Sequence, residues 1–134
     1  GLADAVRCLG HVLSLREFLG WLAAVDVVIN LRHPTVGETS AVALRALVAG
    51  RALVVYDHGW YAELPADICV KLPPLDHAAL TATMRTLAAD PQARAALGRR
   101  GEAYVRERHA PAAAATAYLA FVEQVIASAV SLAP

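Results

Sequence analysis

Three short apolar runs, rich in β-branched residues, alternate along the chain with segments of helical periodicity. The runs cover residues 27–31, 52–56 and 68–72. Continuous apolar runs of this length are typical of strands that are covered on both faces. Repeated strand, loop and helix segments favour right-handed crossovers between parallel strands. The sequence therefore predicts an α/β fold, a Rossmann-like open parallel sheet with helices on both faces.

Capping residues indicate where the helices begin and end. Ser14 and Glu17 have capping-box spacing, and apolar residues recur at helical spacing from there to about Val25. A second helix follows Thr39 and Ser40 and stops at Gly50. The last third of the chain is expected to be helical, with helices that begin at Asp76, Asp90-Pro91 and Pro111 and end near Ala89, Val105 and Ser131.

Two further expectations concern the ends of the chain. Residues 7–12 resemble a short strand or the end of one. The last helix contains the alanine-rich tract 112–115, but larger side chains still recur on one side of it and predict a packing face. The residues of that face are Tyr118, Phe121, Val122 and Val125.

Composition limits the classes of function. The chain has 134 residues, 57% of them hydrophobic, and a formal net charge of zero, which favours one globular domain and excludes the basic footprint of a nucleic-acid-binding protein. No apolar run reaches the roughly 18–20 residues of a membrane span, and the first residues lack the order of a signal peptide, so we expect a cytoplasmic protein. Cys8 and Cys69 lack metal-site spacing and are expected to be buried free thiols.

The loop after the first predicted strand, residues 32–40, is the first candidate site. Ligands of open α/β sheets bind beyond the carboxyl ends of the strands. Gly37, Thr39 and Ser40 lie just before a helix, where free N–H groups and the helix dipole favour an anion such as a diphosphate. Arg32 is a further candidate for phosphate contact. The alternative is that Thr39 or Ser40 only caps the helix.

Acidic residues follow both of the first two strands. Glu38 stands at a helix N-terminus, where a carboxylate either complements its own helix or accepts hydrogen bonds from ligand hydroxyls such as those of a sugar. The second loop carries His58, Gly59 and Glu63 after Asp57. We expect the two loops to converge on one crevice. The remaining histidines are weaker candidates (His11 and His33) or expected to be solvated (His77 and His109).

Other chemistries find no support in the sequence. The motifs GxGxxG, GxxxxGK[ST], GxSxG and HExxH do not occur, so the usual signals of dinucleotide binding, P-loops, serine hydrolases and zincins are missing. Asp57 lacks the acidic pair that a phospho-acceptor receiver domain requires. Four arginines alternate with Glu102 and Glu107 in a helical segment, and this pattern is typical of a solvated face. The four are Arg99, Arg100, Arg106 and Arg108.

Short motifs follow one another in a fixed order along nearly the whole chain. They are Arg32-x-Pro34-Thr35-x-Gly37-Glu38-Thr39-Ser40, then Leu44-Arg45-Ala46-Leu47-x-x-Gly50-Arg51-Ala52-x-Val54-Val55, then Gly59-x-x-x-Glu63-Leu64-Pro65. Leu80, Leu87, Asp90-Pro91, Arg94, Leu97-Gly98 and Tyr118 continue the series. This ordered set resembles the group 1 family of GT-B glycosyltransferases.

The resemblance implies that residues 1–134 are the C-terminal, nucleotide-sugar-binding half of a GT-B fold, truncated on its N-terminal side. The acceptor domain, the first strand and helix of the donor domain, and the family's Arg and Lys diphosphate clamp would lie upstream. The family typically retains anomeric configuration and needs no metal or other cofactor. Residues 6–12 would then lie near the nucleotide base, with Cys8, Leu9 and Gly10 as backbone neighbours.

The chain departs from the family at its paired glutamates. The family often has a Glu that contacts the sugar and, after seven residues, a second Glu that contacts the ribose. Alignment on residues 44–47 places Gly37 and Arg45 at these two positions, with Glu38 one residue away from the first. Either Glu38 takes the sugar role in a loop that differs by one residue, or the donor is read differently.

The functional expectation is donor binding by this chain and glycosyl transfer by the full-length enzyme, whereas the chain alone would be inactive. The expected donor-binding residues are Arg32, Gly37, Glu38, Thr39, Ser40, His58, Gly59 and Glu63, and no catalytic base is assigned. Two alternatives remain open. One is a degenerate GT-B-like binding or regulatory module, and the other is a sugar-nucleotide epimerase fragment of the same fold.

Overall fold

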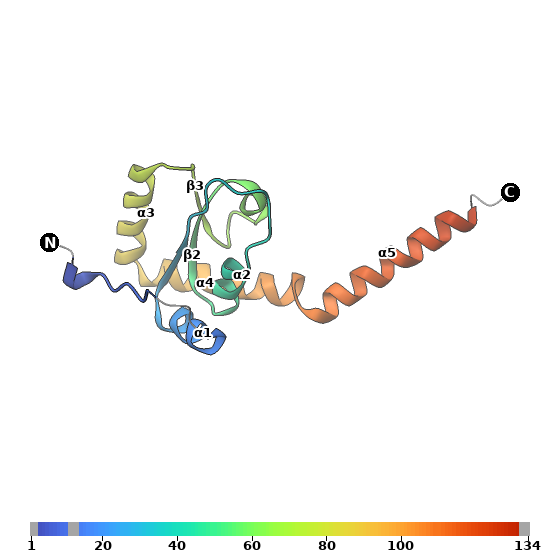
Figure 1. Ribbon diagram of the computed structural model, residues 1–134, viewed down its shortest axis with the longest axis horizontal. Coiled ribbons are helices and arrows are strands. Elements are labelled where there is room, and N and C mark those ends of the chain that lie inside the picture. Colours follow the sequence, from blue (N-terminus) through green and yellow to red (C-terminus); the bar gives the residue numbers. More distant parts are fainter. Residues whose placement is uncertain (1–2, 11–13, 132–134) are drawn as a thin grey trace.

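The computed structural model describes residues 3–10 and 14–131, with side chains as far as residue 128. Its centre is a sheet of three parallel strands in the order β1-β2-β3, formed by Val27–Asn30, Ala52–Tyr56 and Val70–Leu72 (Figure 1). Every residue of β2 is buried, as expected of a central strand. The predicted α/β class with an open parallel sheet is confirmed.

Alternate residues of β2 face two separate cores, and helices cover both. Leu53 and Val55 belong to the larger core, together with residues of α1 (Leu15–Ala24), α2 (Ala41–Val48) and α4 (Pro91–Arg108). Val54 and Tyr56 belong to a smaller core with Leu87 of α3 (His77–Ala89). Because side chains point alternately to opposite faces of a strand, one buried strand organises both layers.

The predicted helix starts are confirmed by capping hydrogen bonds. The Ser14 hydroxyl accepts from the Glu17 N–H, and the Ser14 N–H donates to the Glu17 carboxylate, which completes the capping box of α1. The carboxylates of Asp76 and Asp90 accept from the Ala79 and Ala93 N–H groups, each at 2.8 Å, and so cap α3 and α4. Gly50 follows α2 with φ of +65°, a conformation that favours glycine after a helix.

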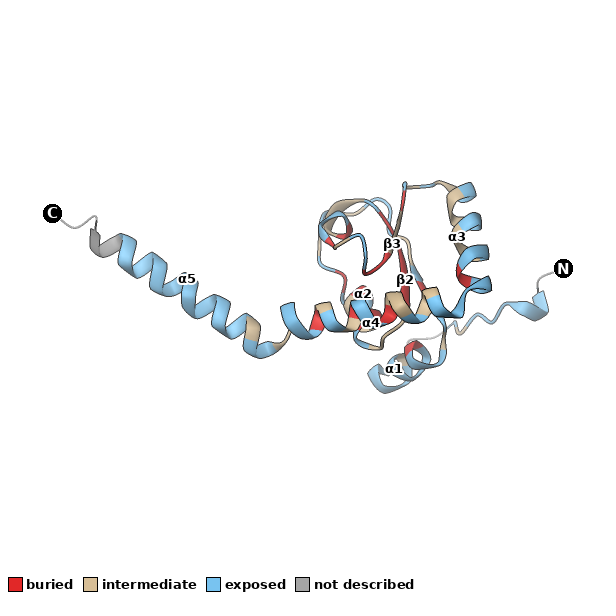
Figure 2. Ribbon diagram, turned by 180° about the vertical axis from the view of Figure 1, so that it is seen from behind, coloured by how far each residue is buried: buried red, intermediate tan, exposed pale blue. Residues whose placement is uncertain are grey.

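Helix α5 (Pro111–Ser131) leaves the body of the molecule after a bend at the end of α4 and extends alone (Figures 1 and 2). The predicted helix is confirmed, but the expected packing face has no partner among the described residues. All of its members are exposed, namely Tyr118, Phe121, Val122 and Val125. The periodicity was sufficient to locate an apolar face and did not determine what covers it.

Three expectations about the N-terminal part are wrong. Residues 7–10 form no strand, since a strand requires a neighbour to pair with. A 3-10 turn (Ala3–Ala5, η1) precedes them. Residues 11 and 12 lie outside the described residues. Ile29 is 43% exposed because β1 is an edge strand that is not covered on both faces. Cys8 is exposed, whereas Cys69 is buried and both thiols are free.

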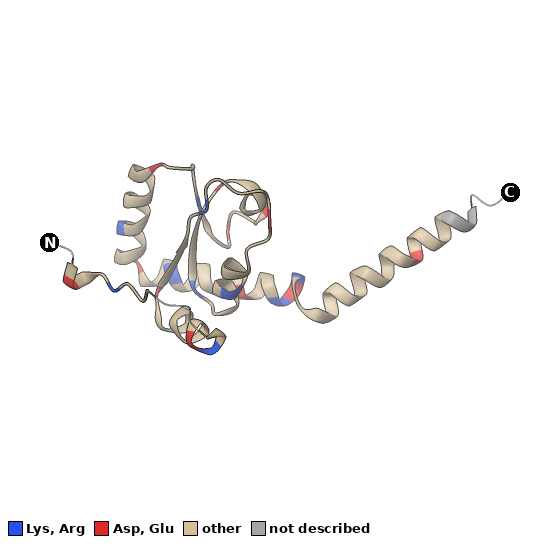
Figure 3. Cartoon of the chain, in the orientation of Figure 1, with Lys and Arg blue, Asp and Glu red and all other residues tan. Residues whose placement is uncertain are grey.

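The arginine-rich face of α4 is solvated as expected. Arg99, Arg100, Arg106 and Arg108 are all exposed, and Arg106 pairs with Glu102 one turn away at 2.7 Å. Figure 3 shows basic and acidic segments along the same helix. Within the described ranges no single helix is long and apolar enough to cross a membrane. Only α4 and the part of α5 to Ser128 pass that test together, as a pair bent by 42°.

Candidate functional site

The loops that follow β1 and β2 touch each other beyond the carboxyl ends of these neighbouring strands. A Cβ added to Gly59 would lie 2.6 Å from the Thr35 Cγ2 and 3.6 Å from the Gly37 Cα, so only a glycine fits against the first loop. Gly59 also has φ of +56°, which a side chain disfavours. The rings of His33 and His58 lie 5.4 Å apart. The structure therefore brings the two sequence-predicted loops together.

The Glu38 carboxylate is held by its own loop. One oxygen, Oε2, accepts hydrogen bonds from the Thr35 hydroxyl at 2.7 Å and the Val36 N–H at 3.1 Å, while Oε1 pairs with Arg32 at 2.5 Å. The Thr35 hydrogen bond, followed by backbone hydrogen bonding and with a contribution from Arg32, lowers the pKa of Glu38. A carboxylate offers about four acceptor positions, so one position is left for a ligand hydroxyl.

Ser40 is buried, and its hydroxyl is used in hydrogen bonds within the domain. Its side chain is 3% exposed, and its hydroxyl accepts from the Ala43 N–H at 3.2 Å and from the Asn30 Nδ2 at 2.9 Å. The hydroxyl thus caps α2 and ties the helix to the end of β1. Of its neighbours, Thr39 and Gly37 are exposed, and Gly37 has φ of +89°.

A lysine that the sequence analysis did not single out organises the second loop. The Lys71 ammonium donates to the Ala62 carbonyl at 2.7 Å and lies 3.7 Å from the Asp57 carboxylate. Asp57 itself is exposed, and its N–H donates to the Leu72 carbonyl at 2.8 Å. The available signal was a charged residue inside the apolar run 68–72, which requires a polar partner at the strand end.

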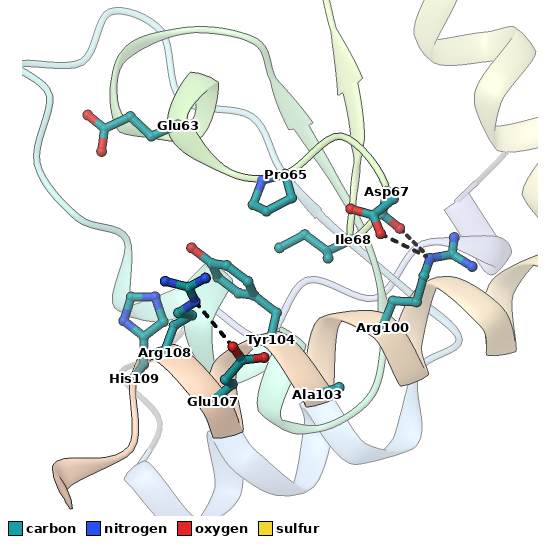
Figure 4. Close-up of a pocket in the computed structure, with 10 residues that line it drawn as sticks. All are labelled: Glu63, Pro65, Asp67, Ile68, Arg100, Ala103, Tyr104, Glu107, Arg108 and His109. Carbon is teal, nitrogen blue, oxygen red and sulfur yellow. Dashed lines mark hydrogen bonds and ion pairs between the residues drawn. The ribbon is translucent and has the colours of Figure 1, made fainter. Parts of the chain in front are cut away.

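Glu63 lies at the far end of the second loop, beside α4. It ends the 3-10 turn η2 (Gly59–Glu63) and borders an open hollow of about 680 Å³ between this segment and the C-terminal half of α4 (Figure 4). Figure 4 shows its carboxylate directed away from Asp67 and Arg100, which pair with each other at 3.9 Å on one side of that hollow. The described contacts of the two converging loops do not include Glu63, so its expected place in the same crevice stays a prediction.

The remaining candidate residues lie outside this loop contact. His77 and His109 are exposed, as expected, and His109 contacts the Tyr104 ring at 5.5 Å. Arg45 is half-buried in α2. His11 falls outside the described residues. In the part of the chain that the structure covers, no group of three or more His, Cys, Asp or Glu side chains is arranged to hold a metal ion.

Comparison with known proteins gives no relative for this chain. It matches no protein-family model, no curated protein and no solved structure. Fold and loop contacts define it as an α/β domain with an open three-stranded parallel sheet and two converging loops beyond the carboxyl ends of β1 and β2.

Proposed function

We propose that this chain is the donor-binding domain of a glycosyltransferase, which binds the nucleoside diphosphate and sugar of a nucleotide-sugar beyond the carboxyl ends of β1 and β2. The observation that supports the proposal is the contact of Gly59 with Thr35 and Gly37, which joins the two loops beside the start of α2. Ligands of open α/β sheets bind at this edge. Transfer itself would need the full-length enzyme.

The chemistry of the first loop suits a diphosphate leaving group. Helix geometry leaves the N–H groups of Ala41 and Val42 without intrahelical acceptors, while Ser40 satisfies Ala43. These N–H groups and the helix dipole favour an anion. Arg32 is half-exposed and is positioned by Glu38, so its guanidinium can add positive charge as the bond between the sugar and the diphosphate breaks.

Glu38 has two roles in this proposal. Its pairing with Arg32 and Thr35 shapes the loop, and its remaining acceptor position binds a sugar hydroxyl. Thr39 is exposed and contacts the diphosphate or sugar, whereas Ser40 acts through the position of α2, because its hydroxyl is already bonded. His58 and Gly59 bring the second loop against the first at this edge of the sheet.

Isothermal titration of the chain with UDP-, GDP- and ADP-glucose, without added metal, tests the proposal. We expect saturable binding of one of the three, since these ligands differ only in the base. Glu38→Ala should weaken that binding at least tenfold, because it removes a sugar contact and releases Arg32. Glu123→Ala removes an exposed carboxylate from α5 and serves as the control. Absence of binding by the folded wild-type chain would contradict the proposal.

A second candidate is a binding or regulatory module of the same fold that does not turn over a substrate. The observation that favours it is the internal use of polar groups, since Glu38 has three partners within its loop and the Ser40 hydroxyl has two in the fold. In that case Glu38→Ala would destabilise the loop, and none of the three nucleotide-sugars would bind.

A further inference from the structure

Helix α5 presents an apolar stripe that nothing in the described structure covers. Six large apolar side chains between residues 111 and 128 of the helix are between 48% and 74% exposed, and they are Tyr118, Leu119, Phe121, Val122, Val125 and Ile126. At 100° per residue these side chains fall within an arc of about 160° on one side of the helix. Ala120, Ala127 and Gln124 lie on the opposite side, so the large apolar side chains are gathered on one side of the helix.

Charge does not interrupt this stripe. Glu123 is the single charged residue in the sequence of α5, where Figure 3 shows one red segment. At 100° per residue it falls outside the arc. Helices that lie on membrane surfaces carry Lys and Arg on the polar face, and α5 has neither. The chemistry of the stripe therefore favours an apolar protein surface of similar shape over a lipid headgroup layer.

The area of the stripe is sufficient for a specific dimer. With roughly 200 Å² for a fully exposed large apolar residue, the exposed fractions of the six residues correspond to about 700 Å² per helix. This exceeds the apolar patch of about 300–600 Å² that monomeric proteins typically expose. Two such stripes together offer at most about 1,400 Å², and the range for stable interfaces begins at about 1,200 Å².

A shallow apolar hollow lies at one edge of the stripe. Ala117, Tyr118 and Phe121 surround an apolar notch of about 210 Å³. Paired helices bury each projecting side chain in a hole between residues of the facing helix. The notch lies at the edge of the stripe, whereas the holes of a helix pair would be formed between the stripe residues themselves.

We propose that α5 is a dimerisation helix, and that two copies of this chain pair through it in antiparallel orientation about Val122. A two-fold axis at Val122 sets Tyr118 opposite Ile126 and Leu119 opposite Val125, so that a large side chain faces a smaller one in each pair. A parallel pair would set Tyr118 against its own copy.

The body of the molecule agrees with antiparallel pairing. It lies at the N-terminal end of α5, and the helix is about 31 Å long (Figure 1). Antiparallel pairing places the two bodies at opposite ends of the helix pair, whereas parallel pairing would crowd them at one end. The proposal is independent of the donor site, which lies in the body.

Sedimentation equilibrium of the 134-residue chain between 1 and 200 μM tests the dimer. We expect a reversible monomer–dimer equilibrium in which Val122→Glu raises the dissociation constant by at least about tenfold, since it buries a charge at the centre of the interface. Ala127→Glu introduces the same charge on the opposite side of α5 and should leave the constant within about threefold. A wild-type chain that stays monomeric would overturn the proposal. The stripe would then be covered by another protein or by a membrane.

Site-specific cross-linking tests the orientation. In a Cys8→Ser background, Val122→Cys should yield covalent dimers with a short thiol–thiol cross-linker, because the two copies of residue 122 face each other. Ile126→Cys should not, because it faces Tyr118 of the partner. The native Cys69 is buried and does not compete. Equal cross-linking at both positions would indicate parallel pairing and would contradict the proposed dimer, as would no cross-linking at either.

Discussion

Gly98 lies where α4 crosses the end of α2, and its replacement by alanine tests that contact directly. A Cβ at this position would overlap the Gly50 carbonyl oxygen and lie 2.7 Å from the Gly50 carbonyl carbon. Both atoms belong to the backbone, so neither can turn aside as a side chain can. We therefore expect Gly98→Ala to move α4 away from α2 and to loosen the larger core.

The magnitude follows from two opposing terms. Alanine is favoured over glycine inside a helix by about 1 kcal/mol. Overpacking in a close contact costs about 1–3 kcal/mol, and the cost is at the upper end here because backbone atoms form the obstacle. The expected net effect of Gly98→Ala is a loss of about 2 kcal/mol in the free energy of unfolding, which lowers Tm by about 8 °C for a chain of this length.

Gly20 in α1 provides the matched control, since a Cβ there would meet nothing within 4 Å. Gly20→Ala should retain the gain in helix propensity, up to about 1 kcal/mol, and raise the urea midpoint. Urea unfolding followed by circular dichroism at 222 nm compares the two variants with the wild type. A Gly98→Ala variant as stable as Gly20→Ala would refute the close crossing of α4 over Gly50.

Three further predictions concern single side chains. Ser40→Ala should lower the free energy of unfolding by about 1–3 kcal/mol, measured by urea unfolding, because it leaves one buried and one part-buried donor without their acceptor. The lowered pKa of Glu38 contributes stability that is complete above its ordinary value of 4.5 and is lost as the pH falls through the lower, folded value. Glu38→Gln should therefore have a lower urea midpoint than the wild type at pH 7. Between pH 4.5 and 3 its midpoint should fall less than that of the wild type. An equal fall in both proteins would argue against the loop contacts. Burial raises the pKa of Cys69 to about 11, so a thiol reagent at pH 8 should titrate only the exposed Cys8 until urea unfolds the chain, and two reactive thiols in the native state would contradict the buried position.

Helix boundaries could be predicted because their signals are local. The capping residues Ser14, Asp76 and Asp90 satisfy N–H groups within three residues, and each makes that bond in the structure. The buried strand β2 was equally clear, since its apolar run fits only the centre of a sheet. By contrast, the run at residues 7–10 has strand-like composition but no neighbouring strand, and composition alone does not supply one.

The candidate site could be located from the sequence, but its contacts could not be. The position of both loops follows from strand order, because the carboxyl ends of parallel neighbours meet at one edge. The loop signal for Glu38 did not reveal that three of its acceptor positions are occupied by Arg32, Thr35 and Val36. Lys71 was missed because its partners are nine residues away or farther, beyond the reach of local pattern.

The meeting of the two loops leads to a prediction about the site itself. Gly59→Ala meets two obstacles, a φ of +56° that costs a side chain about 1–2 kcal/mol, and the Thr35 Cγ2 at 2.6 Å from the new Cβ. We expect a loss of about 2–3 kcal/mol in the free energy of unfolding, of which about 1 kcal/mol arises from the clash.

Thr35→Ser separates the two contributions. Serine keeps the hydroxyl that bonds Glu38 at 2.7 Å and accepts from the Gly37 N–H at 3.2 Å, and it removes only the methyl group. Combined with Gly59→Ala, it should restore about 1 kcal/mol and leave the backbone cost, so the double-mutant cycle should show a coupling of that size. Because residues 35 and 59 belong to different loops, additive effects would mean that the loops do not touch, and the proposed donor site would then lose the contact on which it rests.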